Sequence, residues 1–433
     1  TFVCLTAPGE LAAQSFASSN MEEVTFTRDV APILQENCVR CHRDGGWAPM
    51  SLETYEVASA YAPLIKYKTG LRDKTGAMPP WYVEKDIGIQ QFKNDMSLND
   101  EEIATIAAWA DAGAPQGDPA DMPPLRQFSD SDEWTIRPDL VVRTQDFFME
   151  AVAGDWWGDI EPILIDMPED RYVAATEVRE INDVPDDWGM AGTVGGRFIV
   201  HHLTFVGSVP GDPDGTSRVI PTHEVGRNED IFDLNAGRLL YAGSEINSTS
   251  LHLHANGRDT RAHLEIAFEF HPKGYEPKYN NTRGGGPGGN TVNMDILPNE
   301  SSQVLHAYGV LDEHTKIISY EPHLHAPGER MCMEAIWGSM AETLSCVGYD
   351  HSWVRTYNYA DDYQPLLPKG TILHIIGYMN NTTSNPNVVH SDNWMGGGNR
   401  SVANMFLELG ISVGLTDEEF VAEMAERRKN LNL

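Results

Sequence analysis

The chain has 433 residues, and its 64 acidic side chains oppose 31 basic ones, so its formal net charge is -33. Phosphate binding requires a basic surface, so this balance argues against nucleic acid as a partner. No apolar run approaches the roughly 18 to 20 residues that span a bilayer, so no membrane span is expected. At roughly 150 residues per domain, the length predicts about three domains.

Residues 1–21 are expected to be the remnant of an export signal or a disordered terminus. The sequence TFVCLTAPGELAAQS combines an apolar stretch with small residues that resemble a cleavage site. Cys4 would then have no structural role. Removal of such a signal would place the mature protein in the periplasm or outside the cell.

Residues 22–118 contain the motif for covalent attachment of haem c. In ENCVRCHRDGG, the two thiols of C-x-x-C-H add to the haem vinyl groups and the adjacent histidine binds the iron. Cys38, Cys41 and His42 supply these groups. A redox-active C-x-x-C pair and half of a zinc site are the alternatives, but no second cysteine pair is present to complete a zinc site. Helices are predicted at FTRDVAPILQENC and at SLNDEEIATIAAWADAGAP.

A methionine is predicted as the second axial ligand of the haem iron. Met78 lies in TGAMPPWY, where the prolines would hold the thioether against the iron and raise its potential. Met50 in WAPMSL is the alternative. The C-x-x-C-H motif and the M-P-P-W loop together resemble the class I cytochromes c. The resemblance implies a small all-α domain that accepts and passes on single electrons.

Residues 119–137 form a predicted linker, because this stretch is rich in Pro, Asp and Ser and has no periodicity. From residue 138 onward, short alternating strands are separated by turn residues until a final helix at TDEEFVAEMAERRKN. This pattern predicts two antiparallel β-sandwiches of jelly-roll type, at 138–290 and 291–433. The expected fold is multidomain, with an all-α domain followed by two β-sandwiches.

A disulfide is predicted between Cys332 and Cys346. The segment between them, MEAIWGSMAETLS, has Gly338 and Ser339 at its centre and is typical of a β-hairpin. Directly opposed cysteines in an antiparallel pair lie within disulfide-bonding distance. Two free buried thiols are the alternative. A disulfide would agree with an oxidising location.

Three pairs of histidines stand out in the predicted β region: His201 with His202, His252 with His254, and His323 with His325. Residues two apart in a strand face the same side, so the second and third pairs can each converge on one metal ion. Adjacent residues diverge, so the first pair can share a metal only through a twist or bulge, or through the nearer ring nitrogen. A single strand histidine would more simply be a surface or core residue.

Copper is the metal that these side chains favour. Burying six imidazoles without partners would be costly, and imidazole combined with thioether selects copper over zinc, calcium or magnesium. Met405, in GGGNRSVANMFLELG, begins an alternating strand and is the candidate thioether. Core packing is the alternative role for a strand methionine, and Met379 and Met395 are weaker candidate ligands.

Residues 140–415 resemble the copper type II, ascorbate-dependent monooxygenases, the family of peptidylglycine α-hydroxylating monooxygenase and dopamine β-monooxygenase. The resemblance depends on the order of the motifs VHHLTFVG, LHLHANG, PHLHAPG and GGNRSVANM. It implies an electron-transfer copper with the ligands His201, His202 and His254. It implies a second copper, at which O2 reacts, with the ligands His323, His325 and Met405.

The remaining histidines have lesser expected roles. His252 stands where the peptide-hydroxylating relatives have glutamine, so it is expected to lie behind the ligands or to face the substrate. The others are expected to be structural or at the surface: His223, His263, His271, His306, His314, His351, His374 and His390.

The sequence departs from the peptide-hydroxylating relatives around the second copper. Those relatives carry an arginine two residues before H-x-H, where this chain has Glu321, and a tyrosine and an asparagine where it has Leu409 and Leu407. A peptide carboxylate would meet a like charge at Glu321, which argues against peptide amidation. The pocket is expected to suit a neutral or cationic substrate, with Glu321 beside the ligands.

The expected function is hydroxylation of a small organic substrate with O2 by a copper-dependent monooxygenase. Its own haem domain would replace ascorbate, since a short flexible tether raises the effective donor concentration to the order of mM. An external electron-donor protein or small reductant would reduce the haem. Two alternatives fit the motifs: a haem-copper oxidoreductase that acts on an inorganic nitrogen or sulfur compound or uses peroxide, and a non-catalytic electron-transfer or copper-binding protein. The haem fusion favours a bacterial host, while the substrate, the donor and the oligomeric state, homo-oligomers included, are left open.

Overall fold

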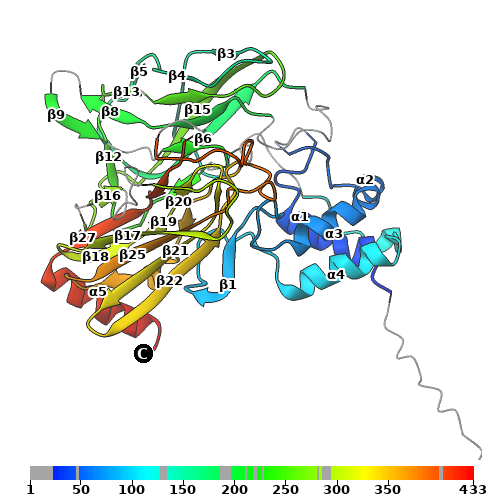
Figure 1. Ribbon diagram of the computed structural model, residues 1–433. Helices are drawn as coiled ribbons and strands as arrows, with labels where there is room; N and C mark the ends of the chain where they lie inside the picture. The colour runs from blue at the N-terminus through cyan, green and yellow to red at the C-terminus, as the bar shows by residue number, and fades with distance from the viewer. Residues whose placement is uncertain are drawn as a thin grey trace, which may run out of the picture.

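The computed structural model describes residues 23–44, 48–126, 134–185, 197–209, 212–217, 222–226, 229–248, 250–279, 282–284, 294–398 and 403–433. The expected signal remnant at 1–21, with Cys4, and part of the predicted linker lie outside the described residues. Within these ranges the chain is mostly β-sheet, with helices near both ends (Figure 1). No helix among them is both long and apolar enough to cross a membrane.

The N-terminal region contains most of the helices. They are the π-helix η1 (Phe26–Val30), α1 (Ala31–Asn37), α2 (Tyr55–Ala60), α3 (Ala62–Gly70), α4 (Asp100–Asp111) and the short 3-10 helix η2 (Pro119–Asp121). Phe26, Leu34 and Trp109 lie at the centre of their common core. Both helices predicted around the C-x-x-C-H motif are confirmed. The Asn99 side chain caps α4 by accepting from the Glu102 amide, and the Glu102 carboxylate accepts from the Asn99 amide.

One segment of this region departs from the all-α prediction. Strand β1 (Val83–Gly88) pairs antiparallel with β22 (Met340–Gly348) of the C-terminal β-sheet region. Trp81 and Val83 are buried in the core of that region rather than among the helices. The two prolines before β1 disfavour a helix here, and pairing with β1 covers an otherwise open edge of β22. The all-α prediction is therefore wrong for residues 83–88.

The strands between residues 140 and 270 form the first β unit. They are β2 (Leu140–Arg143), β3 (Phe147–Met149), β4 (Trp156–Gly158), β5 (Ile163–Leu164), β6 (Arg171–Asn182), β7 (Val200–Leu203), β8 (Val206–Val209), β9 (Asp212–Ser217), β10 (His223–Glu224), β11 (Glu229–Ile231), β12 (Arg238–Leu240), β13 (Glu245–Asn247), β14 (Leu251–Leu253) and β15 (Thr260–Phe270). Their antiparallel sheets have the orders β11-β6-β15-β2, β10-β7-β14-β4 and β5-β13-β8-β9, with β3 and β12 pairing to β15 and β6. Leu264, Ile266 and Phe268 alternate along β15 and are fully buried.

The second β unit contains the remaining strands and the C-terminal helix. They are β16 (Thr282–Gly284), β17 (Gln303–Val310), β18 (His314–Ile317), β19 (Ser319–Tyr320), β20 (Pro322–Leu324), β21 (Gly328–Trp337), β22, β23 (Tyr357–Asn358), β24 (Leu366–Leu367), β25 (Ile372–Met379), β26 (Phe406–Glu408), β27 (Ile411–Leu415) and α5 (Asp417–Asn430), with the 3-10 helix η5 (Asp361–Tyr363). One sheet has the order β1-β22-β21-β25-β17 and another β16-β27-β18-β24, and the pairs β19-β23 and β20-β26 stand apart.

Two local predictions for this unit are confirmed. β21 and β22 form a hairpin in which Cys332 is directly opposite Cys346, and the two cysteines are joined by a disulfide. Gly338 in its turn has a φ of +57°, a left-handed conformation that glycine adopts readily. The final helix α5 begins with a capping box between Thr416 and Glu419.

The two β units meet in a common interior. Ile318, Ile411 and Val413 belong to the second unit but pack in the core of the first. The arrangement of several antiparallel sheets is consistent with the two predicted β-sandwiches. Figure 1 shows the helices α1 to α4 (blue and cyan) beside these sheets. The junction between the two β units carries the histidines that the sequence singled out.

Candidate metal centre

Four side chains lie in one row across the sheet β10-β7-β14-β4. Glu224 pairs with His202. His252 pairs with His202 on one side and with Trp157 on the other. The His252 ring stacks on the Trp157 indole at a centroid distance of 4.2 Å. Directly paired residues share a face of the sheet, so the row places a carboxylate beside two imidazoles, one of them held by an aromatic ring.

A β-bulge brings His201 to this row. In regular antiparallel pairing Leu253 would lie opposite His201, but it is paired with Val200 instead. The extra residue in β7 is left unpaired, so its side chain can turn to the side of its neighbour His202. A bulge, one of the arrangements that would let this adjacent pair share a metal, is therefore present.

Ring nitrogens of His201, His202 and His252 lie within 4.8 Å of one another, and we call these residues the first histidine group. Imidazoles bound to one metal at about 2.0–2.1 Å have ring centroids roughly 4.5–6 Å apart. The three ring centroids are separated by 4.9, 5.0 and 5.5 Å. The group therefore has the donor type and the spacing of a metal site.

The structure brings His252, rather than His254, into the first histidine group. His252 belongs to the first histidine group because its strand position is directly opposite His202. His254 lies beside the group, with its ring centroid 5.4 Å from that of His201. Its Nε2 donates a hydrogen bond to the Phe198 carbonyl oxygen at 3.0 Å. His252 is thus the third member, and His254 is a candidate fourth ligand.

His323 and His325 form the second histidine group, with ring centroids 5.6 Å apart. Strands β20 and β26 pair with Leu324 opposite Phe406, so His325 and Met405 are the next pair in this register. Leu324 and Phe406 point into the core of the second β unit. Because side chains alternate along a strand, both histidines and Met405 lie on the other face. This register supports the predicted ligand role of Met405.

The alternative thioether candidates are explained by packing. Met379 is fully buried in the core of the second β unit, and Met395 packs against the same core. Neither methionine follows the register of β20 and β26 that aligns Met405 with His325. Met405 therefore remains the candidate thioether ligand.

The two rings of the second histidine group are oriented by oxygen atoms at Nδ1. His325 Nδ1 donates to the Ala403 carbonyl oxygen at 3.0 Å. His323 Nδ1 lies 2.6 Å from Oε1 of Glu224, the carboxylate at the end of the first group's row. Metal-binding histidines typically donate their second ring N–H to a carboxylate or carbonyl. The oxygen atoms at Nδ1 of both rings match this arrangement.

Glu321 lies beside the second histidine group. It is fully buried and, two residues before His323, projects from the same face of the strand. Its carbonyl oxygen accepts a hydrogen bond from the Leu409 amide at 2.9 Å, and Leu407 is opposite His323. One carboxylate and two leucines thus lie next to the second histidine group in the sequence or in the register of β20 and β26.

His351 connects the two groups, although its isolated position in GYDHSW predicts a structural or surface role. Its ring centroid lies 4.9 Å from that of His201 and 5.9 Å from that of His325. The packing of its turn against the first β unit brings it to the junction. The two predicted sites are contiguous within one histidine cluster of seven residues: His201, His202, His252, His254, His323, His325 and His351.

Burial keeps several of these rings uncharged. It lowers the pKa of His202 to about 3, against the opposite effect of Glu224. Burial and the neighbouring imidazoles lower the pKa of His325 to about 4 and that of His351 to about 3. Neutral imidazole is the form that binds metals, so at neutral pH these rings offer lone pairs.

Among the described residues, the ring nitrogens of the histidine cluster that are buried without a hydrogen bond include Nδ1 of His202, His252 and His351. Leaving a buried polar atom unpaired costs roughly 1–3 kcal/mol, and folded proteins mostly avoid it. A metal ion could bond to the lone pairs of ring nitrogens that accept no hydrogen bond from the protein. The cluster therefore fits a metal centre.

Cys38, Cys41 and His42 follow α1 directly, and the two cysteines are free thiols. Burial raises the pKa of Cys38 to about 12 and also raises the pKa of Cys41. Redox-active C-x-x-C pairs have a lowered cysteine pKa, so this alternative is disfavoured. The buried His42 donates from Nδ1 to the Pro49 carbonyl oxygen at 2.9 Å, which leaves the Nε2 lone pair for an axial bond.

The surroundings of His42 also bear on its predicted partner. Met50 follows Pro49 on the Nδ1 side of the His42 ring and packs against the helical core. If Met50 stays in this core, the second haem ligand would have to come from another segment, such as the one that carries Met78. The loop 75–82 that carries Met78, here the Met78 loop, contacts the turn before His351, where Gly76 N donates to Asp350 Oδ2 at 3.1 Å.

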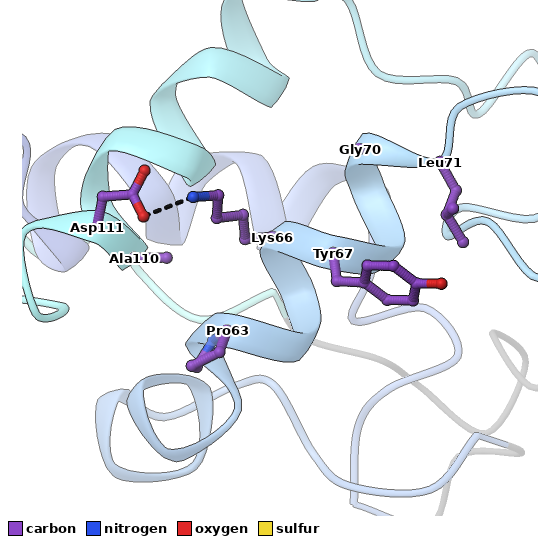
Figure 2. Close-up of a pocket in the computed structure, with 7 residues that line it drawn as sticks. All are labelled: Pro63, Lys66, Tyr67, Gly70, Leu71, Ala110 and Asp111. Carbon is purple, nitrogen blue, oxygen red and sulfur yellow. Dashed lines mark hydrogen bonds and ion pairs between the residues drawn. The ribbon is translucent and has the colours of Figure 1, made fainter.

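Figure 2 shows a surface groove between α3 and α4, which is remote in sequence from the histidine cluster. It is lined by Pro63, Lys66, Tyr67, Gly70, Leu71, Ala110 and Asp111. Lys66 Nζ and Asp111 Oδ1 form an ion pair of 2.5 Å at its edge. None of the predicted site residues lines this groove.

Comparisons with known proteins assign no family. No protein-family model and no curated sequence matches the chain. Among solved structures, PNGF-II in space group P21 matches with 10% identity and a TM-score of 0.29. The match covers 64% of this chain and 65% of the PNGF-II chain, so this chain spans less than two thirds of the length of PNGF-II. Vicilin from Solanum lycopersicum (tomato) matches with 7% identity and a TM-score of 0.13, over 60% and 75%. TM-scores this low support no argument about function.

Proposed function

We propose that this chain is a copper-dependent monooxygenase that hydroxylates a small organic substrate with O2, using electrons from haem c bound to its own N-terminal region. The reaction converts R–H, O2, two electrons and two protons into R–OH and water. The observation that carries the proposal is the histidine cluster at the junction of the two β units, in a chain that also bears a C-x-x-C-H motif. Both features gather side chains of the types that bind copper and haem iron.

Two copper ions are proposed. The first would be held by His201, His202 and His252, and the second by His323, His325 and Met405. Bound copper would supply one-electron redox chemistry and the activation of O2. Glu224 and the Ala403 carbonyl oxygen hold protons on Nδ1 of the second group's rings, so that Nε2 remains the metal-binding atom.

Residues beside the second histidine group define the substrate class. Glu321 would repel an anionic substrate such as a peptide carboxylate, while Leu407 and Leu409 would contact apolar carbon. The proposed substrate is therefore small and neutral or cationic. Its hydroxylated C–H bond would lie on the face shared by His323 and His325.

The N-terminal region is proposed to bind haem c through Cys38, Cys41, His42 and Met78. The haem would supply single electrons, which it would receive from an external donor protein or a small reductant. The contact between the Met78 loop and Asp350 supports transfer within one chain. The disulfide is compatible with an extracellular or periplasmic location, and we propose export in a bacterial host.

A single-turnover experiment tests the proposal. In the copper-loaded chain the haem and both copper ions are first reduced without oxygen, so that the two electrons of one turnover are present. The chain is then mixed with ¹⁸O-labelled O2 and a panel of neutral and cationic substrates. We expect two copper ions per haem, haem oxidation that depends on substrate, and labelled product. His323→Ala and Met405→Ala should abolish product, whereas Met340→Ala, at an exposed hairpin position, should not. Equal product from His323→Ala and the wild type contradicts the proposal.

A further inference from the structure

His351 stands outside the ligand set implied by the motifs, yet it lies inside the histidine cluster. Its ring is the link between the first and second histidine groups, at 4.9 Å from His201 and 5.9 Å from His325 by ring centroids. Both distances fall in the range of roughly 4.5–6 Å that fits imidazoles on a common metal. Its Nδ1 is buried and has no hydrogen-bond partner among the residues that the structure describes.

The backbone around His351 is held rigidly at this junction. The Asp350 carboxylate accepts a hydrogen bond from Ser352 N at 3.0 Å, and the Asp350 carbonyl oxygen accepts one from Trp353 N at 3.0 Å. These bonds close a turn immediately after β22. A side chain on such a turn keeps its position without help from a ligand.

The same turn is fastened to the first β unit, next to Glu224. Val354 N donates to the Val225 carbonyl oxygen at 2.9 Å. Gly226 has a φ of +95°, and a Cβ atom there would lie 2.7 Å from the Trp353 ring. Only glycine permits this close approach, which presses the turn, and His351 with it, against the strand pair that carries the first histidine group.

We propose that Nδ1 of His351 is an additional ligand of the copper held by His201, His202 and His252. The inference rests on the proposed copper sites and adds to them a ligand supplied by the other β unit. With His351 as a ligand, the first copper would be held by residues of both β units. Binding of this copper would therefore link the first β unit to the second. The His351 Nδ1, buried and without a hydrogen-bond partner among the described residues, would be satisfied by such coordination.

The placement of the turn gives this ligand a second consequence. Asp350 also accepts hydrogen bonds from Gly76 N at 3.1 Å and from Tyr82 Oη at 3.3 Å, both in the Met78 loop. A covalent and hydrogen-bonded route therefore runs from that loop through Asp350 to His351. Electrons from the haem would reach the first copper through one of its own ligands.

Copper binding to variants of the intact protein tests the assignment. We expect His351→Gln and His351→Phe to weaken the binding of one copper ion by about tenfold or more. Removing a residue that only hydrogen-bonds to a metal ligand already lowers metal affinity by about 10–100-fold, so losing a direct ligand should cost at least as much. The Cu(II) electron paramagnetic resonance spectrum of that site should change, while the second site keeps its signal. His390→Gln, at an exposed position, is the matched control.

Two results separate this inference from the proposed function. If the wild type binds no copper, the proposed function fails. If the wild type binds two copper ions and both His351 variants match it in affinity and spectrum, only the role of His351 fails. Should the variants not fold, a crystal structure of the copper-loaded wild type decides the point by anomalous scattering. A copper ion about 2.0–2.2 Å from His351 Nδ1 supports the assignment, and one more than about 3 Å away overturns it.

Discussion

Replacement of Glu423 by glutamine should destabilise the attachment of α5. The Glu423 carboxylate is 7% exposed and accepts from Lys278 Nζ at 2.7 Å and from the Tyr279 hydroxyl, and Lys316 Nζ lies 3.0 Å away. Burial raises the pKa of Glu423, but these partners outweigh it and lower the pKa to about 2. A fall from 4.5 to about 2 corresponds to roughly 3 kcal/mol in favour of the ionised form.

The expected loss in Glu423→Gln is about 2–3 kcal/mol, because Lys278 is partly exposed and solvent screens its share. Lys316 is 3% exposed and, among the described residues, would keep Asp233 as its charged partner, at 3.4 Å. Glu426→Gln is the control, since Glu426 is 60% exposed and 3.5 Å from Lys278. Its loss should stay below about 0.5 kcal/mol.

The assay follows α5 itself, because a chain of several units need not unfold in one transition. Hydrogen exchange of the α5 amides reports its opening free energy, and urea unfolding by circular dichroism gives a second reading. The folded-state pKa of Glu423 is depressed, so its contribution is complete above about pH 4.5 and is lost as the pH falls toward 2. The gap between wild type and Glu423→Gln should therefore close across that window. A gap that is the same at pH 6 and pH 2.5 refutes the reasoning.

Three further outcomes are expected. Asp350→Asn should slow oxidation of the haem by copper and loosen the Met78 loop, because hydrogen bonds to a charged group contribute about 1.5–3 kcal/mol. Stopped-flow absorbance measures the rate of haem oxidation, and an unchanged rate contradicts the route through Asp350. Joint replacement of Cys332 and Cys346 by serine should cost roughly 3 kcal/mol for a loop of this length, measured by calorimetry against the oxidised protein, and a loss well below 1 kcal/mol would count against it. Copper at 100 times its dissociation constant should stabilise the junction by about 2.7 kcal/mol relative to a chelator; an identical melting temperature with copper and with chelator would show that no folded-state site binds it.

Local patterns in the sequence determined much of the structure. The capping residues of α4 and α5 satisfy backbone donors within one turn, and the hairpin that opposes Cys332 and Cys346 is closed by residues next to each other in the chain. The shared face of His323 and His325 follows from the period of two in a strand. Each of these features depends on atoms only a few residues apart.

Tertiary structure decided which of the marked residues come together. The β-bulge at His201 and the choice of His252 over His254 depend on the register between β7 and β14, which lie about fifty residues apart. His351 and Glu224 gave no motif of their own, because the packing of one β unit on the other supplies their partners. The strand β1 also departs from a helical prediction, since the edge of a sheet more than 250 residues away offers its backbone hydrogen bonds. Spacing along a chain sets which way a side chain points, but the long-range packing of sheets sets what it meets.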